Sequence, residues 1–174
     1  MPDIKQRNLC FQIEKNDKAV VYFPAEDGSD ISCMIDTGAN VPIWFMGEKF
    51  LKLHFPSAVK TDKLTIIHGL GKEPLMDVPV WNISLFTIKD DNGESMVFHD
   101  LLVPVIEASK FVFNMLIPLT MLNRTRFSFD YTRSAKYGYF EVNSDKESYY
   151  IRPVFVPDND KYLNKIQAFV QDET

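Results

Sequence analysis

The sequence predicts an all-β protein, mostly strands with one or two short helices, arranged as a barrel or a sandwich. Many short apolar stretches show alternating polar and apolar residues, and turn residues separate them at short intervals. Apolar residues make up 45% and charged residues 25% of the 174 residues, which is ordinary for a globular domain able to bury its own core. No run of about 18 apolar residues occurs, so no membrane span is expected.

The expected strands follow this alternation along the chain. Two strands are expected within residues 9–24, around a polar turn at 14–18. The next turn, at 26–29, contains Gly28, which can adopt a positive φ. Residues 90–93 are typical of a hairpin turn. The remaining strands are expected at 30–35, 41–45, 64–67, 78–88, 96–106, 127–131, 137–142 and 148–156.

Three segments depart from the strand pattern. Apolar residues at helical spacing predict a short helix over 48–55, which Pro56 ends. Residues 111–122 are expected to form a strand, a break near Pro118 and then a short helix. Residues 162–170 predict a C-terminal helix on the same grounds. The residues expected near one face of the first helix are Phe50, Leu51, Leu53 and His54.

Charge and composition argue against several classes of function. The formal net charge of -5 leaves no basic patch for nucleic acid. The three histidines are widely spaced and no nucleotide-binding motif occurs, so neither a metal nor a cofactor is expected. Cys10 and Cys33 fit no metal-binding spacing and should stay reduced, although a disulfide between them remains open. The first residues lack the apolar core of a signal peptide, so a cytoplasmic location without a membrane partner is expected.

One segment, residues 33–40, points to chemistry. Asp36 directly follows apolar residues of an expected strand, where an unpaired carboxylate is costly. Gly38 has no side chain, so its backbone N–H can approach that carboxylate, while Thr37 supplies a hydroxyl and Ala39 leaves room for a ligand. A plain strand-ending turn also favours Asp and Gly, so the tripeptide alone does not decide between a turn and a functional loop.

The stretch Ile-Asp-Thr-Gly-Ala at 35–39 resembles the active-site loop of the retropepsin-like aspartic proteases. Members of this family have one such loop per chain and complete the active site by homodimerisation, and this chain has a single Asp-Thr-Gly. The resemblance implies a retropepsin-like closed barrel of the acid protease type and a symmetric homodimer. It further implies an aspartic endopeptidase with Asp36 as the catalytic residue and Thr37, Gly38 and Ala39 as its support.

Two further segments fall in the order in which this family would place them. One is the flap, a glycine-containing hairpin that closes over the substrate, and the other is a second apolar loop that leads to a short helix. The corresponding residues here are His68, Gly69, Leu70 and Gly71 for the flap and Leu116, Ile117 and Pro118 for the second loop. Pro118 stands where the family has glycine, and Asn40 where an acidic or hydroxyl residue is frequent. The flap candidate could also be an ordinary glycine-rich turn.

The resemblance predicts a protease-like domain over residues 1–138 and a C-terminal extension over 139–174. The extension, a strand and a helix, should pack on the domain or on the dimer interface. Three functions stay open. The first is an endopeptidase that holds extended peptides between two subunits. The second is a catalytically inactive domain of the same fold that binds peptides or acts as a dimerisation scaffold, which Pro118 favours. The third is an unrelated β-barrel binding protein.

Overall fold

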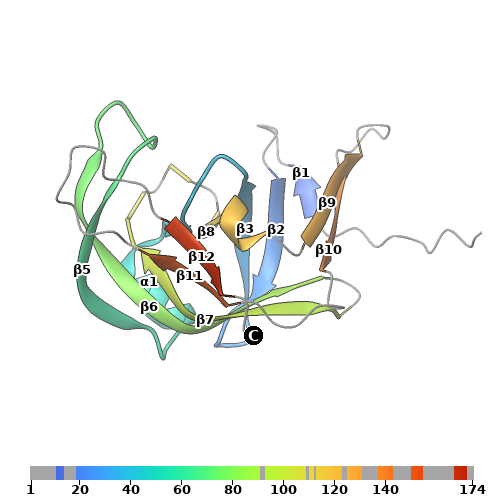
Figure 1. Cartoon of the computed structure of the whole chain (residues 1–174), viewed down its shortest axis with the longest axis horizontal. Coiled ribbons are helices and arrows are strands. Elements are labelled where there is room, and N and C mark those ends of the chain that lie inside the picture. Colours follow the sequence, from blue (N-terminus) through green and yellow to red (C-terminus); the bar gives the residue numbers. More distant parts are fainter. Residues whose placement is uncertain are drawn as a thin grey trace, which may run out of the picture.

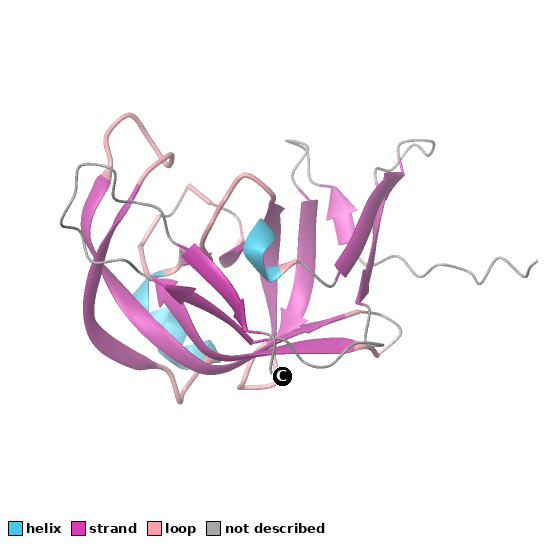
Figure 2. Cartoon of the chain, viewed as in Figure 1, coloured by secondary structure: helices cyan, strands magenta, loops and turns pink. Residues whose placement is uncertain are grey.

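The computed structural model describes residues 11–13, 19–90, 93–108, 110–111, 113–122, 125–130, 137–142, 150–154 and 167–171. Most of these residues lie in strands, with one α-helix and one short 3₁₀ helix (Figures 1 and 2). The predicted all-β class is therefore confirmed. Neither of the described helices is long and apolar enough to cross a membrane.

The largest sheet has seven strands in the order β4-β8-β3-β2-β1-β10-β9. The pairs β1–β2 and β2–β3 are antiparallel neighbours, as expected from their short connections. Gly28, with a φ of 83°, lies in the turn between β2 and β3 as predicted. The turn predicted at 14–18 lies outside the described residues. The bounds of the strands are Phe11–Ile13 (β1), Ala19–Pro24 (β2), Asp30–Asp36 (β3), Ile43–Trp44 (β4), Met115–Pro118 (β8), Thr125–Asp130 (β9) and Tyr137–Val142 (β10).

A second sheet consists of three long strands, β5 (Val59–Ile67), β6 (Leu75–Lys89) and β7 (Ser95–Pro104). Consecutive strands pair antiparallel, so this sheet is two successive hairpins. A hairpin joins β6 to β7, because the Asp90 N–H donates to the Glu94 carbonyl at 2.9 Å and the strands pair with each other. Residues 91 and 92 of the turn predicted at 90–93 lie outside the described residues.

One strand of the large sheet is inserted between two strands that follow each other in sequence. β8 lies between β3 and β4, parallel to β3 and antiparallel to β4. The segment 37–42, which joins β3 to β4, must therefore pass across the end of β8. At that end Asp36 is paired in register with Pro118, and the 3₁₀ helix η1 (Leu119–Met121) follows directly. The strand, break and short helix predicted within 111–122 are thus confirmed.

The main core lies between the large sheet and the three-stranded sheet. Phe23 of β2 meets Phe86 of β6 edge to face, with ring centroids 6.3 Å apart. Isolated bridges from Trp44 to Val105 and from Met46 to Glu107 connect the β4 edge to the segment after β7. The two sheets therefore enclose the main core, and closure into a complete barrel stays a prediction. Trp44 and Trp81 are buried, in line with the expected core or groove-wall positions.

The helix predicted over 48–55 is α1 (Gly47–His54), but the expected apolar face is wrong. Leu51 is fully buried, whereas the side chains of Phe50 and Leu53 are 47% and 59% exposed. The core contacts the line formed by Gly47, Leu51 and Phe55, which are spaced by four residues and therefore lie on one side of the helix. An eight-residue helix offers the core one such line, so its other apolar residues face outward.

The C-terminal extension contains a two-stranded sheet of β11 (Tyr150–Val154) and β12 (Gln167–Gln171), and β11 lies beside β7. The strand expected within 148–156 is confirmed by β11. The helix expected over 162–170 is wrong for 167–170, and 162–166 lie outside the described residues. Phe169 and Val170 have high strand propensity, and β11 provides hydrogen-bond partners that outweigh the helical spacing.

Candidate active site

The Asp36 carboxylate lies where β3 ends and a tight turn begins. The residue is half-buried, and the backbone N–H of Gly38 donates to its Oδ1 at 2.9 Å. The backbone N–H of Ala39 donates to the Asp36 carbonyl at 3.2 Å, which closes the turn. A Cβ built on Gly38 would lie 3.3 Å from the same Oδ1, so glycine allows the close approach. The predicted contact between Gly38 and the carboxylate is present.

The second loop is held against β3 by a polar clamp at the start of β8. The side-chain carbonyl of Asn114 accepts bonds from the Ser32 N–H and hydroxyl, both at 2.9 Å. The Asn114 N–H in turn donates to the Ser32 carbonyl at 2.9 Å. These bonds fix the register that brings Pro118 opposite Asp36. No local sequence pattern predicts this pair, because the two residues are 82 positions apart.

The connection between β3 and β4 is also tied to the second loop. The Thr120 hydroxyl donates to the Asn40 carbonyl at 3.3 Å. Pro118 is buried and extended, with φ -80° and ψ 164°. Proline suits this φ but contributes no N–H, so its position beside Asp36 provides no backbone donor.

The predicted flap residues lie at the tip of the β5–β6 hairpin, at the upper left of Figure 1. Gly69 has a φ of 85°, a conformation that favours glycine, and no atom lies within 4 Å of a Cβ placed there. Gly69 and Leu70 line a cavity together with Asp36, whereas His68 and Gly71 are exposed and are not among its lining residues. The segment is thus a hairpin tip facing the Asp36 loop.

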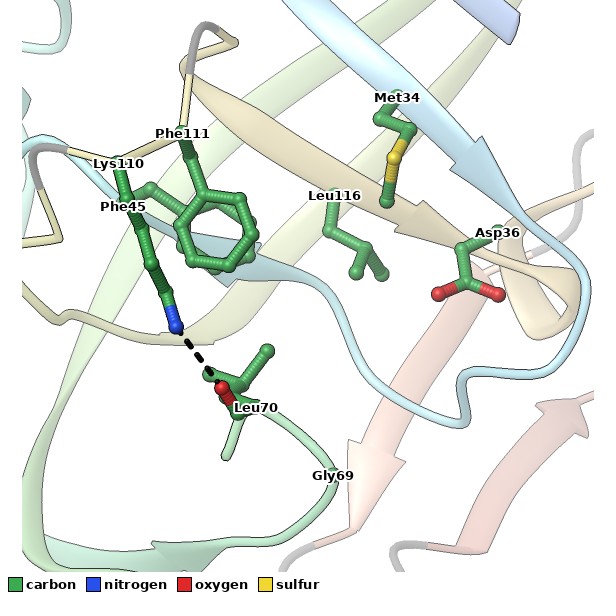
Figure 3. A pocket seen from close by; sticks show the side chains of 8 residues that line it. All are labelled: Met34, Asp36, Phe45, Gly69, Leu70, Lys110, Phe111 and Leu116. Atoms are coloured by element: carbon green, nitrogen blue, oxygen red, sulfur yellow. Dashed lines mark hydrogen bonds between the residues drawn. The ribbon is translucent and has the colours of Figure 1, made fainter. Parts of the chain in front are cut away.

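The cavity has a volume of about 400 Å³ and an apolar wall. Figure 3 shows Asp36 and Leu116 on one side and Gly69 and Leu70 on the other. Among the described residues that line it, Asp36 is the only carboxylate and Lys110 the only cation. The Lys110 ammonium donates to the Leu70 carbonyl at 3.0 Å, so it ties the hairpin tip to the opposite wall. The lining residues are Met34, Asp36, Phe45, Gly69, Leu70, Lys110, Phe111 and Leu116.

The structure brings together four of the residues singled out from sequence, Asp36, Gly69, Leu70 and Leu116. Ile117 is fully buried in the main core and Pro118 is buried beside Asp36, so neither lines the cavity. Sequence reasoning missed Met34, Phe45, Lys110 and Phe111 as lining residues. Met34 could have been found, since it lies two residues before Asp36 and so shares its side of the strand. The other three depend on tertiary packing.

Two other kinds of reactive group bear on the chemistry near this loop. Burial raises the pKa of the Cys33 thiol well above its ordinary value, which keeps it protonated and unreactive, as expected for a buried strand residue. Within the described residues no three His, Cys, Asp or Glu side chains are grouped so that they could hold a metal ion. The charged groups among the described lining residues are the Asp36 carboxylate and the Lys110 ammonium.

Some solved structures are similar to this chain. No family model matches the sequence, and the search of curated proteins gives no match. Among solved structures, the chain is similar to a retropepsin-like aspartic protease from Rickettsia conorii. The sequence identity is 14% and the TM-score is 0.42, over 75% of this chain and 91% of that one.

Proposed function

We propose that this chain is one half of a dimeric aspartic endopeptidase, with Asp36 as its catalytic carboxylate. The observation that carries the proposal is the placement of Asp36. Its carboxylate is held by the Gly38 N–H at 2.9 Å and lines a cavity that has apolar side chains in its wall and a glycine hairpin tip on its opposite side. A carboxylate, an apolar wall and a hairpin over it are the parts needed to bind an extended peptide beside an acid–base group.

The second carboxylate has to come from a second copy of the chain. Aspartic protease chemistry requires two carboxylates close together that share one proton. The two groups cannot both be ionised at that distance, so one is protonated while the other is ionised. Among the described lining residues Asp36 is the only acid. A two-fold axis near Asp36 would bring its symmetry mate into place, since an isologous interface places the same residue of each subunit face to face.

In the proposed reaction the ionised carboxylate accepts a proton from a water molecule while the water oxygen attacks the peptide carbonyl carbon. The protonated carboxylate donates to the carbonyl oxygen and stabilises the negative charge that develops there. The tetrahedral intermediate then collapses and the C–N bond breaks. The leaving nitrogen takes the proton that the first carboxylate accepted from water, and a hydroxyl of the intermediate returns a proton to the second carboxylate, so the pair again shares one proton. The Gly38 bond keeps one Asp36 oxygen in a fixed position throughout.

The proposal is tested by comparing wild type with Asp36→Asn on a diverse peptide mixture, from acidic to neutral pH. The amide is nearly isosteric but cannot serve as the base, so cleavage should vanish while the fold and the dimer persist. Dimerisation is measured on the same samples by analytical ultracentrifugation. Normal cleavage by Asp36→Asn would contradict the mechanism.

A second candidate is a peptide-binding domain or dimerisation scaffold without turnover. The observation that favours it is Pro118, which lies in register with Asp36 and supplies no N–H there. This candidate predicts a dimer that binds extended peptides and leaves them intact. The same two samples separate the candidates, because only the protease loses a measurable activity on Asp36→Asn.

A further inference from the structure

The Lys110 side chain combines a positive charge with an apolar surface at the edge of the cavity. Its ammonium lies 5.2 Å from the centroid of the Phe111 ring, in cation–π range, and 3.0 Å from the Leu70 carbonyl oxygen. These two contacts give the charge a defined position between the wall and the hairpin tip (Figure 3). The side chain is nevertheless exposed, so the charge is accessible from solvent.

The ammonium retains capacity to bind another group. A lysine has three N–H donors, and the Leu70 carbonyl accepts one of them. No carboxylate is paired with Lys110 in the described part of the chain. The protein carries a net charge of -5, and Lys110 is the one cation among the described residues that line the cavity.

The surroundings of Lys110 define which ligand would fit. Met34, Phe45, Phe111 and Leu116 supply an apolar lining suited to one apolar side chain. An extended peptide places successive side chains about 3.3 Å apart along its length and on alternating sides. Residues two positions apart in the peptide therefore point to the same side, about 6.6 Å from each other. One of them can present a carboxylate to Lys110 while the other places its apolar side chain in the cavity.

We propose that Lys110 is a specificity-determining residue that selects peptides carrying an acidic side chain two positions away from the apolar one held in the cavity. This inference rests on the proposed function, since it takes an extended peptide as the ligand. It goes further by naming a charge preference and the residue that produces it.

The test measures binding, so that it does not depend on turnover. Full-length Asp36→Asn is titrated into three fluorescent peptide libraries, in which Glu, Gln or Lys occupies both positions two residues away from a fixed Phe. The expected result is a preference of about fivefold for Glu over Gln at low salt, the size of an exposed charge pair, which decreases as salt is added. Circular dichroism and sedimentation confirm that each variant folds and assembles as Asp36→Asn does.

Two changes at Lys110 and one matched control complete the design. In the Asp36→Asn background, Lys110→Met should bind the Glu and Gln libraries equally, and Lys110→Glu should favour the Lys library. Lys49→Glu carries the same charge change on α1, away from the cavity lining, and should retain the preference for Glu.

Each outcome bears on the inference separately from the proposed function. Three results would overturn the role of Lys110 in selecting acidic peptides. These are equal binding of all libraries, no binding of any library, or a uniform loss of binding in Lys110→Met. Uniform loss would instead indicate that Lys110 only ties down the hairpin tip. Charge-dependent binding without cleavage by wild type would support Lys110 and reject the endopeptidase.

Discussion

Gly38 is the residue on which the geometry of the Asp36 carboxylate depends most directly. A Cβ at this position would lie 3.3 Å from Oδ1, a contact tighter than most, while the φ of Gly38 is one that other residues can adopt. We therefore expect Gly38→Ala to fold but to displace the carboxylate by a few tenths of an ångström. Peptidase kcat/KM should fall on the order of tenfold, because small misplacements of a catalytic group are costly.

Steady-state kinetics and thermal unfolding measured on the same Gly38→Ala sample separate the two effects. An unchanged kcat/KM would show that the 2.9 Å bond does not position the reacting carboxylate. A large loss of thermal stability would instead assign the glycine to folding.

At the residue scale the sequence predicted what depends on nearest neighbours in the chain. The approach of the Gly38 N–H to Asp36 follows from a separation of two residues, and burial of Cys33 follows from strand alternation. The position of Lys110 does not follow in this way, because its partner Leu70 is 40 residues away in another hairpin. Contacts of this length are set by the arrangement of the sheets.

The parallel pair β3–β8 is the element that carries the Asp36 loop. Asn114→Ala removes the oxygen that accepts both hydrogen bonds from Ser32. The N–H and the hydroxyl of Ser32, which is half-buried, then lack this acceptor. We expect a loss of about 1–3 kcal/mol in the free energy of unfolding, as for unsatisfied groups of this kind. Urea unfolding measures this, and Ser84→Ala at an exposed position of β6 is the control, with a change within about 0.5 kcal/mol. Equal effects of the two variants would mean that the clamp does not stabilise the pair.

The turn between β2 and β3 is connected to the last residue of α1. The Ser29 hydroxyl and N–H donate to Asp27 Oδ1 at 2.6 and 3.0 Å, and His54 Nδ1 lies 3.3 Å from Oδ2. The bonds from Ser29, followed by the charge of His54, hold the pKa of Asp27 below its ordinary value, although desolvation opposes them. A lowered folded-state pKa means that the ionised carboxylate stabilises the fold above the unfolded-state pKa.

This stabilisation should disappear as the pH falls through the lowered folded-state pKa of Asp27. Ser29→Ala removes the largest cause, so the Asp27 pKa should rise toward the ordinary aspartate value. Titration of the Asp27 carboxyl carbon by NMR in both proteins measures the shift directly. An identical titration curve in Ser29→Ala would assign the low pKa to another group.

At the element scale, strands with clear alternation were predicted and the exceptions have physical causes. Extended apolar segments predicted β6 and β7, and the turn residues at 90–93 predicted the turn between them. The spacing of apolar residues gave a wrong prediction for β12, where the pairing of Val170 with Ile151 overrides helical spacing. The spacing of apolar residues also predicted the wrong buried face of α1, because apolar residues surround more of this helix than the core can cover. The insertion of β8 between β3 and β4 has no local signal at all.

The whole molecule, in the proposed mechanism, is active only as a pair of chains. A mixed dimer of one wild-type chain and one Asp36→Asn chain lacks half of the carboxylate pair and should be inactive. When the two proteins are mixed in equal amounts and allowed to exchange subunits, about one quarter of the dimers contain two Asp36 residues, as random pairing in a two-fold assembly requires. At the same total concentration of chains, peptidase activity should therefore fall to about one quarter of the wild-type value and not to one half.

The control for this mixing experiment is wild type mixed with an equal mass of an unrelated protein, which should leave the activity of the wild-type chains unchanged. A higher proportion of the Asp36→Asn protein in the mixture should suppress activity steeply, since each wild-type chain then pairs mostly with an inactive partner. Activity that falls only in proportion to the wild-type fraction would mean that each chain works alone. In that case the second carboxylate would have to be sought within the same chain, and the cavity around Asp36 could not be half of a shared site.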